Sequence, residues 1–202
     1  LVIANSPTMG RFETYAGDGS SGLYLWGTQL EVGSSPTSYI PTTSAAASRS
    51  ADLASLAGAG FTSWFNAGEG TVVVDGDSAG ALAGHYPWCL SDNINSQSSA
   101  MLAAQFRVSS NQIRVWQSTS GGSLDDFITP SGANKYGRLS VAYGAGLKVS
   151  ASALGGAVVT MASNMQTSLF NGLVIGNAAG FAGAVNGHIS RLTYYPKRLP
   201  NA

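Results

Sequence analysis

Acidic residues are the first side chains to consider, because hydrolysis of a glycosidic bond needs two of them. One carboxyl group acts as the acid and the other as the base or nucleophile, and retaining enzymes hold the two about 5 Å apart. The glutamates Glu13, Glu31 and Glu69 stand far apart in this sequence. Asp125 and Asp126 are adjacent, so a strand would point them to opposite faces. These carboxylates do not predict a glycosidase.

Asp75 and Asp77 have the spacing to share one face of a strand, but the glycine and the serine beside them favour a turn. A serine hydrolase needs a Gly-x-Ser-x-Gly segment placed between a strand and a helix, and no such context is predicted in this chain. His188 falls at the start of a predicted strand and His85 in a predicted loop, so both are interpreted as structural. We predict that the chain is not an enzyme.

Side chains that bind metals are sparse. A zinc site needs several His or Cys residues close together, and this chain has two histidines and one cysteine, Cys89, far apart in the sequence. Calcium takes roughly six to eight oxygen ligands. Asp75, Asp77 and residues 92–95 offer oxygens but form no defined calcium loop. We predict no cofactor, with calcium at these turns as the alternative. Cys89, between a tryptophan and a leucine, is predicted to be a small core residue.

Aromatic rings beside amide and charged groups form platforms for sugars and for protein contacts. In the predicted strand 112–117, Ile113 and Val115 point to one face. Trp116 points to the other face, among polar neighbours. The predicted ligand-binding or interface residues are Trp116, Arg114, Gln112 and Tyr86. Three interpretations of Trp116 stay open: a contact between subunits, a platform for a glycan or other ligand, or a ring covered by a loop.

Composition narrows the classes of partner. Charged residues make up 10% of the 202 residues, well below the roughly 25% of an ordinary domain. Ten acidic and ten basic residues give a net charge of zero, and only Lys197 and Arg198 form an adjacent basic pair. Binding to nucleic acid needs clustered basic residues. No apolar run reaches the roughly 18 residues of a membrane span. Nucleic acid and membrane insertion are therefore not expected.

Short apolar runs separated by Gly, Ser, Asn and Pro predict an all-β fold. Ile189 and Leu192 have an odd separation within the last predicted strand, so we expect either a bulge near residues 190–191 or a strand covered on both faces. The predicted strands are 12–15, 22–31, 69–75, 86–91, 100–108, 112–117, 138–144, 147–153, 156–161, 172–176 and 187–195.

Several segments carry a resemblance to a known family. They are Gly68–Val74, Tyr136–Tyr143, Ser150–Gly156, Leu173–Gly176 and above all Gly187–Leu199. Together they resemble the concanavalin A-like, laminin-G-like jelly-roll domains of tail fibres, spikes and other virion proteins of tailed phages. Leu25–Glu31 followed by Ser38–Thr42 looks like the end of the carbohydrate-binding-module-like sandwich that often precedes this jelly roll.

The resemblance implies an antiparallel jelly-roll β-sandwich over residues 60–202. Residues 1–43 would be the C-terminal part of a preceding β-sandwich, and residues 44–59 a linker with room for one strand. About 42 residues are too few for a sandwich, which normally needs roughly 100. We therefore expect the given sequence to be part of a longer chain. The missing partner strands would lie upstream, in another chain or against the second domain.

The resemblance also implies a function. It points to a non-enzymatic virion protein, a tail fibre, spike or capsid decoration module that displays a receptor- or glycan-binding jelly roll. The expected partners are other virion proteins, copies of the chain in a homotrimer, and a host cell-surface glycan, with the protein on the exterior of the virion and so extracellular. Two alternatives remain, a secreted bacterial lectin or adhesin module and an accessory domain of a polysaccharide depolymerase.

Overall fold

The computed structural model falls into two compact units, residues 1–32 with 38–47 and residues 33–37 with 48–202. Each unit is described by itself. Across both units, the structure describes residues 18–20, 22, 24–32, 38–48, 54–78, 84–95, 100–107, 112–119, 122–128, 136–144, 146, 148–164, 170–178 and 183–200. Within these ranges, no helix is long and apolar enough to cross a membrane.

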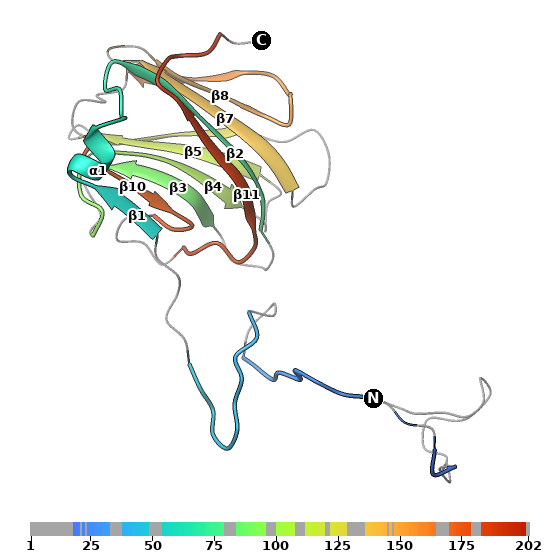
Figure 1. Ribbon diagram of the computed structural model, residues 1–202. Helices are drawn as coiled ribbons and strands as arrows, with labels where there is room; N and C mark the ends of the chain where they lie inside the picture. The colour runs from blue at the N-terminus through green and yellow to red at the C-terminus, as the bar shows by residue number, and fades with distance from the viewer. Residues whose placement is uncertain are drawn as a thin grey trace. The chain divides into compact units, whose positions relative to one another are not determined.

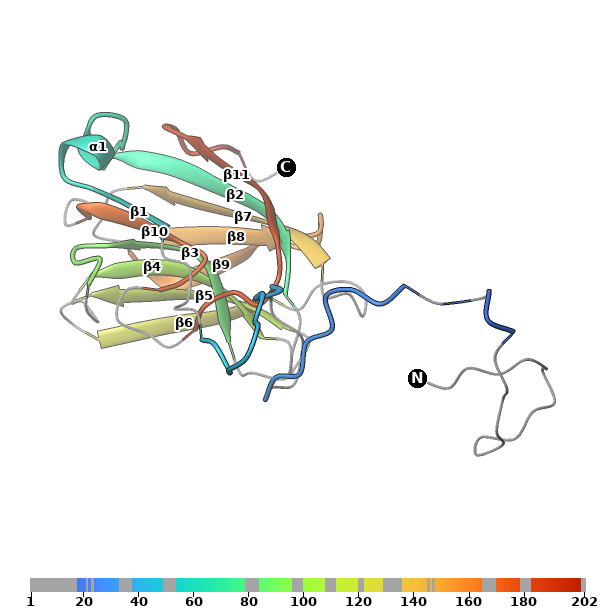
Figure 2. The same cartoon turned by 60° about the horizontal axis from the view of Figure 1, so that its bottom comes forward.

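The second unit is built from two antiparallel sheets packed face to face (Figures 1 and 2). The six-stranded sheet has the order β1 (Ala54–Ala57), β10 (Gly172–Ile175), β3 (His85–Ser91), β4 (Met101–Arg107), β5 (Gln112–Thr119) and β6 (Gly122–Ile128). The five-stranded sheet has the order β11 (Ile189–Tyr195), β2 (Glu69–Asp77), β7 (Tyr136–Gly144), β8 (Lys148–Ala153) and β9 (Val159–Asn164). A single-turn helix, α1 (Ala59–Thr62), follows β1. The predicted all-β jelly-roll sandwich is confirmed.

Some elements differ from those predicted. β1 lies inside residues 44–59, where the predicted linker left room for one strand, and pairs with β10. β6 was not predicted as a strand. The predicted strand 22–31 is wrong for the residues of that range that the structure describes, which carry no strand. The predicted strand 12–15 lies outside the described residues.

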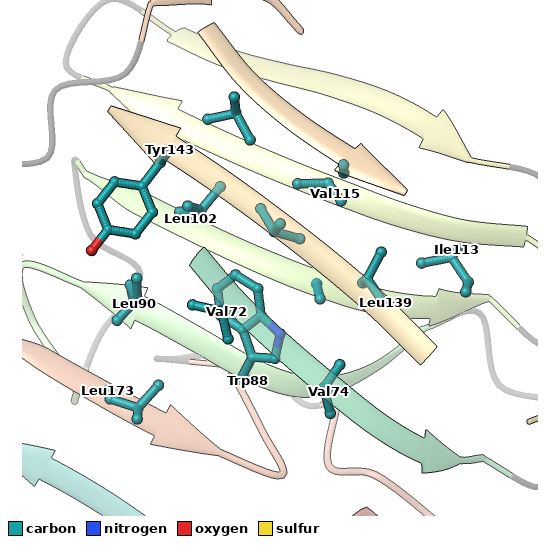
Figure 3. Close-up of a cluster of buried hydrophobic side chains, with 14 of the residues drawn as sticks. Val72, Val74, Trp88, Leu90, Leu102, Ile113, Val115, Leu139, Tyr143 and Leu173 are labelled. Carbon is teal, nitrogen blue, oxygen red and sulfur yellow. The ribbon is translucent and has the colours of Figure 1, made fainter. Parts of the chain in front are cut away.

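The core lies between the sheets and follows the two-residue period of the strands (Figure 3). Trp88 of β3 is its largest fully buried side chain, at 0% exposure. Val74 of β2 and Leu139 of β7 belong to the same buried cluster from the other sheet, also at 0%. The indole of Trp88 is thus buried in a core to which both sheets contribute aliphatic side chains.

The last strand contains the expected irregularity. The register between β11 and β2 shifts between Ile189 and Arg191, which is a β-bulge. The bulge changes the phase of the side chains, so Ile189 and Leu192 both pack against the core despite their odd separation. The prediction of a bulge at residues 190–191 is confirmed.

Beyond β11 the chain crosses the outer face of the five-stranded sheet. Arg198 donates hydrogen bonds from its guanidinium to the carbonyl oxygens of Ala142 (3.2 Å) and Lys148 (3.0 Å) and to Ser150 Oγ (2.8 Å). Its backbone N–H donates to a carboxylate oxygen of Glu69 at 2.9 Å. The terminal segment is therefore tied to β2, β7 and β8 by one arginine.

An aromatic corner joins α1 to the sandwich. Tyr143 Oη lies 3.0 Å from the backbone oxygen of Asn66 and 3.0 Å from Tyr194 Oη, and the Asn66 N–H donates to Tyr194 Oη at 2.9 Å. Burial, together with the hydrogen bond to Tyr194, raises the pKa of the Tyr143 phenol. Phe65 stacks on Tyr143 with ring centroids 5.9 Å apart. The rings fix the segment that leads into β2.

In the first unit, the longer described segments are residues 24–32 and 38–47. The ring of Trp26 lies 5.1 Å from that of Tyr39, and Ile40 N donates to Gln29 Oε1 at 2.8 Å. Large apolar side chains alternate along this segment, and Leu30 and Val32 are exposed at 101% and 109%. The segment thus has the pattern of a strand with one apolar face that the described residues leave uncovered.

Candidate functional site on the outer face of the six-stranded sheet

A second apolar cluster lies on the outer face of the six-stranded sheet, away from the core between the sheets. A row of residues paired across β10, β3, β4 and β5 runs through it: Val174, Cys89, Ala103 and Trp116. The first three are 0% exposed, so Cys89 is buried as predicted. Trp116 is half-buried and packs against the cluster. It stands where the cluster meets solvent.

Arg114 and Gln112 share this face with Trp116, as the strand alternation predicts, and both are half-buried. Ile113 and Val115 point the other way and are 5% and 1% exposed in the core. The guanidinium carbon of Arg114 lies 5.3 Å from the centroid of the Trp116 ring, within the range of a cation–π contact. The pair combines a planar hydrogen-bond donor with an apolar ring, which suits a polar ligand with one apolar face.

Tyr86 belongs to the same cluster but lies deeper. Only 5% of its surface is exposed, and its N–H donates to the carbonyl oxygen of Gly183 at 3.0 Å. A Cβ on Gly183 would come within 2.6 Å of the Tyr86 ring, so the glycine allows the backbone to pass directly over it. Tyr86 therefore supports this face from beneath, and Trp116, Arg114 and Gln112 form its more accessible part.

The carboxylates around β2 are used in structural contacts. Arg138 donates two hydrogen bonds to Asp75, at 2.7 and 3.0 Å, and this bonding holds the pKa of Asp75 below its usual range. Asp77 Oδ1 accepts a hydrogen bond from the His188 N–H at 2.5 Å. These contacts join β2 to β7 and to the approach of β11. Both aspartates therefore accept hydrogen bonds that hold strands and loops together.

The turn at residues 92–95, one predicted alternative for calcium, is held by its own hydrogen bonds. Asp92 Oδ2 accepts from Ala100 N at 3.2 Å, and Asn93 Oδ1 accepts from Asn95 N at 3.0 Å. Over the part of the chain that the structure describes, no three His, Cys, Asp or Glu side chains gather as metal ligands would. These oxygens therefore match the turn geometry of Asx side chains.

A serine–histidine pair is the feature that the sequence analysis missed. Ser78 lies in the stretch Gly76-Asp77-Ser78-Ala79-Gly80, which has the letters of the hydrolase motif, and Ser78 Oγ contacts Nδ1 of His85. In the described residues this motif is followed by β3 and not by a helix. Ser78 and His85 are only 1% and 0% exposed. A nucleophile must reach its substrate, so we interpret the pair as a structural link between β2 and β3.

The buried histidine predicts a pH dependence of stability. Burial lowers the pKa of His85 from its usual 6.5. The unfolded chain regains the ordinary pKa, so below it the unfolded state binds a proton that the folded state does not. Stability should therefore be full above pH 6.5 and fall as the pH drops below that value. Urea unfolding at about pH 7 and about pH 5 measures this loss. The same loss in a His85→Gln variant would contradict the assignment.

Comparisons with known proteins support the fold. No family model matches the sequence, and no curated protein matches it. The structure is similar to the Ruminococcus gnavus IT-sialidase CBM40 bound to alpha2,3 sialyllactose, with a TM-score of 0.55 and 12% identity over 69% of this chain and 81% of that chain. It is also similar to the NanB sialidase of Streptococcus pneumoniae, with a TM-score of 0.56 and 14% identity over 68% of this chain and 23% of that one.

A leech intramolecular trans-sialidase is similar to the same degree, with a TM-score of 0.54 and 14% identity, over 67% of this chain and 22% of that chain. The chain thus spans most of the carbohydrate-binding module but less than a quarter of either full sialidase. At these identities the likeness establishes the jelly-roll sandwich as the shared fold.

Proposed function

We propose that this chain is a non-catalytic module that binds a glycan on the outer face of its six-stranded sheet. The observation that carries the proposal is the contact between Arg114 and Trp116 on the outer face of the six-stranded sheet, 5.3 Å from guanidinium carbon to ring centroid. The likeness to a module crystallised with sialyllactose supports this choice of ligand class.

The chemistry of the face fits a sugar. The half-buried Trp116 ring offers apolar area to the C–H face of a pyranose, and the Arg114 guanidinium offers paired N–H donors to hydroxyl or carboxylate oxygens. Gln112 adds an amide at the same face. Because Trp116 packs on buried neighbours, its ring is held in place before a ligand arrives, which limits the entropy lost on binding.

The setting of the module remains a proposal that rests on the sequence resemblance. It places the chain in a phage virion, outside the particle, as part of a tail fibre, spike or decoration protein, with residues 1–43 closing a preceding sandwich. The first unit supports the proposal that residues 1–43 belong to a preceding sandwich. Its apolar side chains alternate, and Trp26 and Leu30 are 85% and 101% exposed, so they need a covering sheet. Immunogold labelling of purified particles with an antibody to this chain tests the location.

Binding to 3′- and 6′-sialyllactose, followed by a wider glycan array, tests the proposed function. Trp116→Ala and Arg114→Met should each weaken binding by about tenfold to a hundredfold, because each removes an anchor of about 1–3 kcal/mol. Arg138→Met is the matched control, since Arg138 pairs with Asp75 on the other sheet and should leave binding unchanged.

Circular dichroism and the thermal midpoint of each variant establish that the sandwich is intact. Equal binding by the wild type and both variants would place the glycan elsewhere on the molecule. Absence of binding across the array would remove the glycan proposal. Release of reducing sugar from any polysaccharide by the purified chain would show that the module is catalytic.

A further inference from the structure

The sandwich is closed along one side and open along the other. β6 and β9, the edge strands of the two sheets, contact each other at the closed side. At the open side the edge strands are β1 and β11, and Figures 1 and 2 show each as the outermost strand of its sheet. A groove of about 300 Å³ lies there, lined by uncharged side chains from both sheets, among them Leu56, Val72 and Leu192. This side of the core is therefore incompletely covered.

The two strands that border the groove differ in how they present their edges. β11 carries a bulge and the charged residue Arg191, both of which discourage pairing with another strand. β1 has the sequence Ala-Ser-Leu-Ala, without charge, proline or bulge, and all four residues are exposed. Among the described strands only β10 pairs with β1. β1 is thus an unprotected edge.

The hydrogen bonds to β10 fix which groups of β1 point outward. Just beyond β1, Gly58 N donates to the carbonyl oxygen of Asn171 at 3.3 Å. Two residues earlier, the carbonyl oxygen of Leu56 also points to β10, where it would lie 3.1 Å from a Cβ on Gly172. Hydrogen-bonded and non-hydrogen-bonded pairs alternate along an antiparallel ladder. Leu56, opposite Leu173, therefore bonds to β10, whereas Ser55 and Ala57 direct their N–H and C=O groups to the open edge.

We propose that β1 pairs with β1 of a second copy of this chain across a twofold axis at Leu56. In this register Ser55 of each copy lies opposite Ala57 of the other, and both pairs exchange two backbone hydrogen bonds. Leu56 then faces Leu56 of the second copy at the closely spaced, non-hydrogen-bonded position. Because Leu56 lines the groove and is 42% exposed, each copy covers the open side of the other.

The observations favour a second copy over another extended partner. When two β1 strands pair antiparallel about Leu56, Ser55 of one copy lies opposite Ala57 of the other, so one strand sequence supplies both partners. The strand has no charge and the whole chain has a net charge of zero, so two copies do not repel each other. The two six-stranded sheets would form one continuous sheet. A four-residue contact is small, so the dimer is expected to be weak and dependent on concentration.

Sedimentation velocity of the full chain over roughly 2 to 200 µM tests the proposal. The variant is Ser55→Pro, which removes an outward N–H without removing a bond to β10, and proline is tolerated at such edge positions. Ser55→Ala is the matched control, because it keeps the N–H. The wild type and Ser55→Ala should form dimers with the same affinity. Ser55→Pro should raise the dissociation constant by about 30-fold or more, since two symmetric hydrogen bonds are lost.

Other results would overturn the proposal. A wild type that stays monomeric at the highest concentration has no such interface. A dimer that Ser55→Pro does not weaken uses another surface, and a trimer, which the sequence resemblance predicted, cannot be held by one twofold edge. If Ser55→Pro fails to fold, amide hydrogen exchange of the wild type decides instead. The Ser55 and Ala57 amides should exchange more slowly as concentration rises, and unchanged exchange would refute the pairing.

Discussion

Trp88→Ala is expected to lower the free energy of unfolding by about 3–5 kcal/mol, the range for truncating a large aromatic side chain in a core. The indole is 0% exposed and lies between the two sheets in the same buried cluster as Val74 and Leu139 (Figure 3). Its removal leaves a cavity that paired strands cannot collapse to fill. Urea unfolding followed by circular dichroism measures the change.

Trp26→Ala is the matched control for this truncation. Trp26 is 85% exposed and its described ring contact is with Tyr39, so the change should stay within about 0.5 kcal/mol. A loss for Trp88→Ala no greater than that for Trp26→Ala would show that the assigned core does not carry the stability of the sandwich.

Arg198→Met is expected to cost about 2–3 kcal/mol of stability, because hydrogen bonds from a charged group are worth more than neutral ones. The methionine keeps the length of the side chain but cannot donate to Ala142 O, Lys148 O or Ser150 Oγ. The two carbonyls and the hydroxyl would lose this charged donor on a partly covered face, although Ser150 Oγ keeps its contact with Thr160 Oγ1 at 3.1 Å. The unfolding midpoint should fall by several degrees.

Lys197→Met provides the comparison within the same dipeptide. The Lys197 side chain is exposed, and its backbone oxygen, which accepts a hydrogen bond from Thr71 Oγ1 at 3.0 Å, is unaffected by the substitution. Little change is expected for it. If the two variants lose the same stability, the effect comes from charge in general and not from the contacts of Arg198.

The parts of the fold that the sequence predicted are those set by local pattern. The alternation of Ile113 and Val115 with Arg114 and Trp116 fixes which face of β5 is buried, whatever the neighbouring strands are. The odd spacing of Ile189 and Leu192 predicted either a bulge or a strand covered on both faces for the same reason, and a bulge is present. Such inferences need only the two-residue period and the presence of one core.

The parts that the sequence did not predict depend on distant residues. β1 was expected only as one possible strand within the linker, without bounds, because its four small or aliphatic residues become a strand through pairing with β10. The two adjacent acidic residues of β6 obscure its alternation. Residues 24–32 are the opposite case. Their apolar side chains alternate clearly, but no described strand pairs with this segment and it carries no strand itself.

The candidate site divides in the same way. The shared face of Trp116, Arg114 and Gln112 follows from the strand period, whereas the contact between Arg114 and Trp116 depends on side-chain conformation that no spacing reveals. The depth of Tyr86 comes from Gly183, far along the chain, which lets the backbone cover the ring. The Ser78–His85 pair has a signal in the sequence, a serine between glycines with a histidine seven residues later. The burial of the two side chains could not be predicted from that signal.

The pairing of the first strands with the last has a consequence for how the protein folds. Ala54 of β1 pairs with Ile175 of β10, and Thr71 of β2 pairs with Tyr195 of β11. During synthesis, β1 stays without its partner until β10 has left the ribosome, and β2 lacks one of its two partners until β11 has followed. Contacts between such distant residues slow folding, because a long loop must close before they form. The sandwich is therefore expected to fold slowly and only after β11 has been synthesised, with an unprotected apolar edge exposed in the meantime.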